Sequence, residues 1–307
     1  MSLTDRPARS IARWFGASSA VLLLVAGCVA SGSVASPKTP GGSSSPSAPA
    51  PSSSPSTSVP SSAKGFYLRA WQTQALAVEH TFGRLPIATI SNGQYIDGIV
   101  AVPAIYPGPL WVGPSAQTIS ATGIDMIVAE ARKQGLLGTK SDFTGTPMPG
   151  AIAGHIELIV DGTTYDLTGS PDAIVDQGST AAAGTPAAFA AFWQKLTGLA
   201  AWLPNELGQS ASYEPDHLAA LALPPTDAGS GITPTEVAWP LATPFSKFGT
   251  ALGNDTYRCA VVTGADLAKL EPVVKQANQL TRFVDSANVK DSLLVRVLVP
   301  GEPSPCL

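Results

Sequence analysis

The chain has 307 residues, of which 44% are hydrophobic and only 13% are charged. The charges are unevenly placed, because residues 65–307 carry 13 Lys and Arg against 21 Asp and Glu, a net charge of −8. So acidic a body argues against binding to nucleic acid and against adhesion of its surface to anionic lipid.

The N-terminus has the three parts of an export signal. Three arginines stand among the first 13 residues, and an apolar stretch runs over 15–26. This stretch is well short of the roughly 20 residues that a membrane-spanning helix needs. It ends in two small residues and a cysteine, Ala26-Gly27-Cys28.

This order of basic residues, apolar stretch and small-small-Cys resembles the lipobox signal of bacterial lipoproteins. The resemblance implies that Cys28 receives a diacylglyceryl group, that residues 1–27 are removed, and that the protein stays on the extracytoplasmic face of the cell membrane. Two or three acyl chains would anchor it durably, since each buried CH₂ contributes about 0.8 kcal/mol. The alternatives are an ordinary secretory signal in which Cys28 has no part, or an uncleaved anchor.

Residues 28–64 form the next segment, which is rich in Ser and Pro and contains no aromatic residue. Such a segment cannot bury enough apolar surface to offset the entropy of ordering it, so we expect a disordered tether. It would reach about 33 Å as a random coil and about 110 Å as a polyproline helix. Ser and Thr beside Pro are also typical acceptors of O-linked sugars.

We expect a globular body over 65–307, either as one large domain or as two subdomains divided near 170–184. Three helices are predicted in it. The first spans about 123–134, with a Thr122/Asp125 capping pair. The second begins with Thr185-Pro186, an N-cap followed by a first-turn proline, and continues with an aromatic stripe that we interpret as core. The third spans about 263–280, and its internal proline should kink or restart it.

Strand-like stretches lie between these helices. The strongest hairpin signal is Asp161-Gly162, which separates alternating stretches at 155–160 and 163–168. Further strands are predicted at 66–73, 86–91, 218–223, 257–262 and 292–299. Hairpins beside isolated helices predict an α+β fold, with a mainly antiparallel sheet and about three helices packed on it.

The three cysteines fit an exported protein. Cys28 belongs to the signal, which leaves Cys259 and Cys306. Outside the cytoplasm thiols tend to be oxidised, so we interpret this pair as a disulfide bond. The alternative is a metal site, but the sequence has neither a CxxC motif nor a His-rich spacing, and we expect no metal ion and no cofactor.

Catalytic motifs are scarce. There is no G-x-S-x-G elbow, no phosphate-binding glycine loop and no H-E-x-x-H. His155 and Glu157 alternate on one predicted strand and could share a metal or a proton. The run Glu214-Pro215-Asp216-His217 places two carboxylates near an imidazole, whose pKa they could raise. In both cases we prefer the structural alternative, a solvated sheet face and a turn with local charge pairing.

The loop over 105–112 is the one binding surface that the sequence indicates. It is apolar, yet too rich in Pro and Gly for a helix or a central strand. Loops usually lie on the surface, so Tyr106 and Trp111 could form an exposed recognition patch. The alternative is that both rings fold back onto the core.

The mature region also resembles uncharacterised secreted proteins of high-GC actinobacteria. The runs that carry this likeness are Tyr106-Pro107-Gly108-Pro109, the segment 239–244, the segment 258–264 and the segment 277–282. The resemblance implies no activity and no catalytic residue.

Two functional classes stay open. We expect the body to be a non-catalytic binding or interaction module of the cell envelope. Its partners would be the membrane, through the lipid anchor, and an envelope protein or a wall ligand, but no nucleic acid. The alternative is a cell-envelope hydrolase whose site a single sequence does not reveal.

Overall fold

The computed structural model describes residues 65–101, 104–146, 150–173, 181–225, 229, 231–252 and 256–306. The predicted signal peptide over 1–27, the acylation site at Cys28 and the predicted tether over 28–64 lie outside these residues. The helices and strands that the structure describes therefore all belong to the body.

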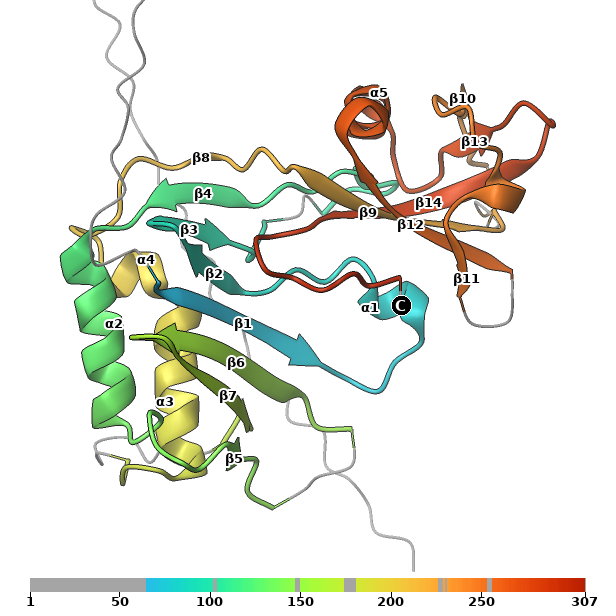
Figure 1. Ribbon diagram of the computed structural model, residues 1–307. Helices are drawn as coiled ribbons and strands as arrows, with labels where there is room; N and C mark the ends of the chain where they lie inside the picture. Colours follow the sequence, from blue (N-terminus) through green and yellow to red (C-terminus); the bar gives the residue numbers. More distant parts are fainter. Residues whose placement is uncertain are drawn as a thin grey trace, which may run out of the picture. The chain divides into compact units, whose positions relative to one another are not determined.

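Eight strands form the first sheet, in the spatial order β5-β7-β6-β1-β2-β3-β4-β8 (Figure 1). Neighbouring strands are antiparallel, except that β5 runs parallel to β7. The strands are Tyr67–Thr73 (β1), Ala88–Ser91 (β2), Gln94–Asp97 (β3), Ser115–Thr118 (β4), Asp142–Phe143 (β5), Ala153–Val160 (β6), Thr163–Gly169 (β7) and Ala211–Ser212 (β8).

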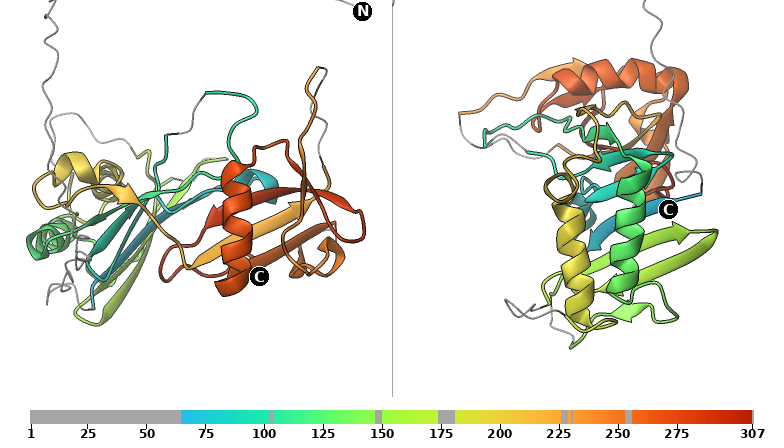
Figure 2. Two further views of the ribbon diagram at one scale, coloured as in Figure 1. Left: turned by 90° about the horizontal axis from the view of Figure 1, so that it is seen from above. Right: turned by 90° about the vertical axis from the view of Figure 1, so that its left-hand side faces the viewer.

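Helices cover one face of the first sheet. α2 (Ala121–Lys133) and α3 (Pro186–Thr197) lie side by side against it, and the short α4 (Leu199–Trp202) follows α3 (Figure 2). Alternate residues of β6 are buried, and Ile156 and Leu158 share a core cluster with residues of both long helices. The opposite face of β6 carries His155 and Glu157 beside Ala153 and Ile159.

Two local predictions explain these elements and are confirmed. The Thr185 hydroxyl accepts a hydrogen bond from the Ala188 N–H at 3.2 Å, and Pro186 occupies the first turn of α3. Asp161 and Gly162 have φ values of 50° and 76°, as the tight two-residue turn between β6 and β7 requires.

Six strands form the second sheet, in the order β10-β13-β14-β9-β12-β11. They are antiparallel, except that β10 runs parallel to β13. The strands are His217–Leu223 (β9), Glu236–Ala238 (β10), Thr250–Leu252 (β11), Tyr257–Thr263 (β12), Arg282–Val284 (β13) and Lys290–Val297 (β14), and the 3₁₀ turn η2 spans Phe245–Lys247.

Both faces of the second sheet are covered at its central strand, β9. The even-numbered residues 218–222 share a core cluster with α5 (Gly264–Gln276). The odd-numbered residues 219–223 share another cluster with Phe82, which follows the short α1 (Val78–Thr81), and with Cys306. This double cover explains why β9 is a continuous apolar run in the sequence.

The α+β class with mainly antiparallel strands is confirmed. Among the described helices, the three long ones have 13, 12 and 13 residues. The strands are shared between two sheets, of which the first carries α2 and α3 and the second carries α5 (Figure 2).

Two features of the long helices differ from the predicted ones, namely the N-cap of α2 and the course of α5 at its internal proline. The N-cap of α2 is Ser120 and not Thr122, because the Ser120 hydroxyl accepts the Gly123 N–H at 3.0 Å. α5 contains Pro272 without ending or restarting there. Leu270 and Val274, on either side of this proline, are fully buried in the core, and this packing offsets the lost backbone hydrogen bond.

The chain passes from the first sheet to the second between Ser212 and His217. The sequence indicated a division into subdomains at the loop over 170–184. This loop joins β7 of the first sheet to α3, which packs on the same sheet. Residues 174–180 of this loop lie outside the described residues.

Cys259 and Cys306 form the predicted disulfide bond, with Cα atoms 5.2 Å apart. The bond joins β12 to the end of residues 298–306, which we call the C-terminal tail. The Thr250 hydroxyl donates a further hydrogen bond to the Cys306 carbonyl at 2.9 Å. The tail is thus held at both ends, by β14 and by β12.

Breaking this disulfide should destabilise the body. The bond spans 47 positions, and constraining a loop of that size in the unfolded chain is worth about 4 kcal/mol on the entropic model. We expect Cys306→Ser to lower the free energy of unfolding by about 2–5 kcal/mol in denaturant titrations. Equal unfolding midpoints for the variant and the oxidised wild type would contradict this assignment.

A carboxyl in β14 should make stability depend on pH. Burial, assisted by the charge of Asp285, raises the pKa of Asp291 from 3.8 to about 6. The fold therefore favours the protonated form, and this contribution is present below pH 3.8 and lost as the pH rises through 6. Asp291→Asn should raise the melting temperature at pH 8 and leave it nearly unchanged at pH 3.5. A gain of the same size at both pH values would refute the shift.

Candidate functional site

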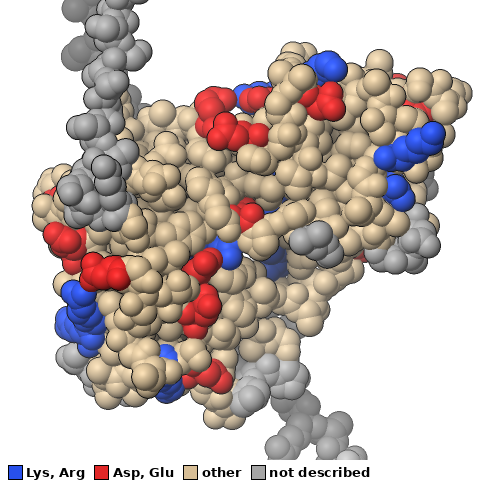
Figure 3. Space-filling model, viewed as in Figure 1, with Lys and Arg blue, Asp and Glu red and all other residues tan. Residues whose placement is uncertain are grey.

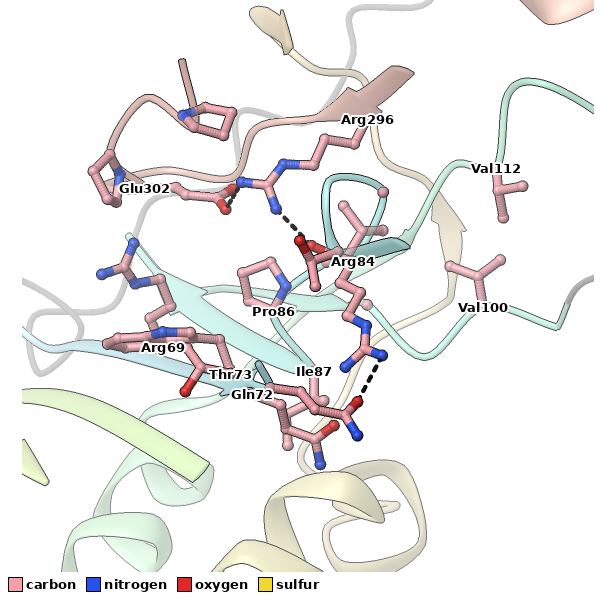
Figure 4. Close-up of a pocket in the computed structure, with 18 of the residues that line it drawn as sticks. Arg69, Gln72, Thr73, Arg84, Pro86, Ile87, Val100, Val112, Arg296 and Glu302 are labelled. Atoms are coloured by element: carbon pink, nitrogen blue, oxygen red, sulfur yellow. Dashed lines mark hydrogen bonds and ion pairs between the residues drawn. The ribbon is translucent and has the colours of Figure 1, made fainter. Parts of the chain in front are cut away.

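A cavity of about 940 Å³ opens where the end of β1, the segment 81–87 and the C-terminal tail meet (Figure 4). Sites for small ligands typically have roughly 300–1,000 Å³, so the volume is sufficient for one. Its charged lining consists of Arg69, Arg84, Arg296 and Glu302. In the space-filling view, Lys and Arg atoms reach the surface near the middle of this face, beside Asp and Glu atoms (Figure 3).

The tail forms one wall of the cavity and is fixed against β1. The Tyr67 hydroxyl donates a hydrogen bond to the Pro300 carbonyl at 3.1 Å. Gly301 follows with a φ of 76°, and a Cβ atom there would lie 2.6 Å from the Tyr67 oxygen. Only glycine suits this position, because both the backbone conformation and the close approach exclude a side chain.

Arg296 of β14 connects the tail to the segment between α1 and β2. One guanidinium nitrogen donates to the Arg84 carbonyl at 2.5 Å, and another pairs with the Glu302 carboxylate. Burial lowers the pKa of Arg296 and raises the pKa of Glu302, whereas their mutual attraction opposes both shifts. The Arg296 Nε is buried without a hydrogen-bond partner among the described residues.

Arg84 differs from the other two arginines in its partner. Its Nη2 donates to the side-chain oxygen of Gln74 at 3.0 Å, which is the lower dashed line in Figure 4. Among the described residues, no carboxylate lies within ion-pair distance of it. The Arg84 guanidinium is therefore oriented by a neutral amide, and no carboxylate among the described residues balances its charge.

Arg69 of β1 is paired with a carboxylate and also lies over an aromatic ring. Its Nη2 is 3.0 Å from a carboxylate oxygen of Glu157, and its guanidinium carbon is 4.3 Å from the centre of the Trp71 ring. The Trp71 ring in turn stacks on His155, with ring centres 5.2 Å apart. Arg69 and Trp71 line the cavity, and His155 lies beside Trp71 on the same face of the first sheet.

His155 and Glu157 lie on the same face of β6, as their alternation predicted, but each has its own partner. The His155 ring is hydrogen-bonded to the hydroxyls of Thr73 at 2.8 Å and Thr168 at 3.2 Å, and burial lowers its pKa. Glu157 pairs with Arg69. The described residues contain no group of three or more His, Cys, Asp or Glu side chains placed to hold a metal ion.

The run 214–217 is spread around the start of β9. Glu214 is exposed and lies 3.8 Å from the Lys275 Nζ of α5. His217 is the first residue of β9, and its carbonyl accepts the Leu298 N–H at 3.0 Å. These contacts are those of a turn and a strand end, and none of them reaches the cavity lining.

The loop over 105–112 is held by the segment that follows α5. Gly108 exchanges two hydrogen bonds with Gln279, and the Leu110 N–H donates to the Ala277 carbonyl at 3.0 Å. Tyr106 is 64% exposed. Trp111 packs against the core cluster of the second sheet, with the Lys275 Nζ 5.2 Å from its ring centre.

The two aromatic residues of this loop therefore differ, since Tyr106 projects outward and Trp111 folds back. The next residue, Val112, lines the cavity, so the loop runs from an exposed ring to the edge of the candidate site.

Sequence reasoning did not find Arg69, Arg84, Arg296 or Glu302. The Arg296–Arg84 contact spans 212 positions, and no spacing pattern describes contacts between segments so far apart. One signal was available, because Arg69 and Arg296 each interrupt an apolar strand. A buried arginine must be paired, so each of them pointed to a partner elsewhere in the chain.

No known family model, curated protein or solved structure matches this chain. A membrane-spanning helix, long and apolar enough to cross a bilayer, does not occur among the described residues.

Single substitutions in the 105–112 loop should separate its two rings. Tyr106→Ala removes an exposed side chain and should change the free energy of unfolding by less than about 0.5 kcal/mol. Trp111→Ala removes core contacts and should cost about 1–3 kcal/mol. Thermal denaturation of both variants checks this. A large loss for Tyr106→Ala, or none for Trp111→Ala, would reverse the assignment of the two rings.

Proposed function

We propose that the chain is a cell-envelope lipoprotein, anchored by acylated Cys28, whose body binds a ligand in the cavity without catalysing a reaction. The lipobox signal supports the anchor, and the Ser- and Pro-rich segment over 28–64 supports a spacer. A spacer lets an anchored domain search its surroundings at high effective concentration.

The single observation that carries the binding function is a cavity whose polar groups are fixed by other parts of the fold. The tail is held by the disulfide at Cys306 and by the Tyr67–Pro300 hydrogen bond. Gln74 orients Arg84. Walls fixed in this way favour binding, because little entropy is lost when a ligand enters.

The lining supports a binding role over a hydrolytic one. Among the described lining residues the one carboxylate is Glu302, and Arg296 is already paired with it. A glycosidase needs two carboxyl groups with different protonation states, and an acyl hydrolase needs a nucleophile beside a base. The described lining has no second carboxyl group. Its Thr73 hydroxyl does lie 2.8 Å from the His155 Nε2, but the other nitrogen of that ring is held by the Thr168 hydroxyl and not by a carboxylate.

Tyr106 is proposed as an outer contact. Its ring is exposed, and the loop that carries it ends at the cavity edge with Val112. A ligand longer than the cavity, such as a wall polymer or a segment of an envelope protein, could contact both.

The anchor is tested by Cys28→Ala. The variant should accumulate as an unprocessed precursor or leave the cell, and it should no longer partition into detergent. Phase separation and mass determination of the mature protein check this. A processed Cys28→Ala protein that still enters the detergent phase would disprove the lipobox assignment.

Binding is tested with a bulky residue in the cavity wall. Soluble cell-wall fragments released by a muramidase serve as the probe for titration calorimetry on the full chain in detergent. Val100→Trp fills the cavity and should abolish the heat of binding. The matched control is Val289→Trp, at an exposed position of the turn between β13 and β14. Equal binding by both variants, or cleavage of the fragments seen by mass spectrometry, would overturn the proposal.

A further inference from the structure

One cationic side chain of the cavity lining, Arg84, has no carboxylate partner among the described residues. Arg296 is paired with Glu302, and Arg69 is paired with Glu157, whereas Arg84 is held by the Gln74 amide. A half-buried guanidinium with no carboxylate partner among the described residues is poorly compensated.

The donors around Arg84 are arranged for a small acceptor. One guanidinium N–H is used for Gln74, and a guanidinium has five such donors in a planar fork. The Gln74 side chain accepts this bond with its oxygen, so its NH₂ group is left to donate beside the same fork. Together they present several N–H donors to the cavity.

The rest of the cavity lining combines uncharged polar side chains, namely Gln72, Thr73, Thr81 and Ser304, with apolar ones. Pro86 and Ile87 follow Arg84 in the chain, and Val100 and Val112 form the adjacent wall (Figure 4). Pro303 and Pro305 of the tail add rigid apolar surface. A second cation that could neutralise a doubly charged group at Arg84 is not available, since both other arginines are engaged by carboxylates.

We propose that Arg84 binds a single carboxylate, and that this carboxylate is the free C-terminus of a short peptide with small apolar side chains. One uncompensated cation matches a monoanion. The planar fork fits the two coplanar oxygens of a carboxylate, which it can hold with two parallel N–H···O bonds. The apolar wall accommodates the peptide's own side chains.

This inference rests on the proposed function and names the chemistry of the ligand. The probe is N-acetyl-alanyl-alanine, which carries one negative charge, and its matched control is the C-terminal amide of the same peptide. Titration calorimetry uses the full chain in detergent. The amide should bind about ten- to a hundredfold more weakly than the acid, because it loses a charge-assisted hydrogen bond.

Variants of Arg84 locate the effect. Arg84→Gln should weaken binding of the acid to the level of the amide and leave the amide unchanged. Arg84→Lys keeps the charge but loses the fork, so it should fall between them. The control Arg132→Gln removes an exposed cation from α2 and should have no effect on the acid.

Acetate and dimethyl phosphate separate the sources of the anion. Both should bind more weakly than the peptide acid, because neither acetate nor dimethyl phosphate carries the side chains that would contact the apolar part of the wall. The inference is overturned if acid and amide bind equally, if neither binds, if Arg84→Gln has no effect, or if either small anion binds more tightly. Should cell-wall fragments still bind in any of these cases, the binding function stands and only the carboxylate assignment fails.

Discussion

The buried guanidinium of Arg296 joins β14 and the C-terminal tail, which follows it directly, to the distant segment around Arg84. Its backbone belongs to β14 of the second sheet, its hydrogen bond to the Arg84 carbonyl reaches the connection between α1 and β2, and its ion pair holds Glu302 of the C-terminal tail. Removing a charge from water is costly unless hydrogen bonds and an opposite charge replace the solvent. The fold meets this requirement by bringing these three segments together, and the cavity is the space left between them.

The same arrangement explains why Arg84 is available to a ligand. Its carbonyl is used by Arg296, while its side chain turns to Gln74 and stays without a carboxylate. Arg69 and Arg296 line the same cavity but are both neutralised. The disulfide at Cys306 also helps to position Glu302, because it fixes the far end of the tail that carries this residue.

The elements that could be predicted from the sequence are those governed by local physics. The turn at Asp161-Gly162 and the Thr185-Pro186 cap each depend on a few adjacent residues. The disulfide was predictable because only two cysteines were left outside the signal. Ser120 was missed as a cap because Thr122 offers the same hydroxyl chemistry two residues later.

The candidate site depends on contacts that local patterns do not encode. The division of the strands into two sheets follows from which faces of β9 are covered, and that cover comes from α5, the residues around α1 and the tail. Tyr106 could be predicted as exposed, but Trp111 could not be placed without knowing that Lys275 and the second core lie beside it.

A double-mutant cycle on Arg296 and Glu302 tests the central claim most directly. Arg296→Met and Glu302→Met should each cost about 3–5 kcal/mol of stability, because each leaves a buried charge unpaired. The double variant replaces both charges with apolar side chains and should cost much less than the sum, with a coupling energy of at least about 2 kcal/mol in denaturant unfolding. Additive losses would show that the two groups do not stabilise one another, and the tail would then be held by its disulfide and by the hydrogen bonds of Tyr67 and Thr250.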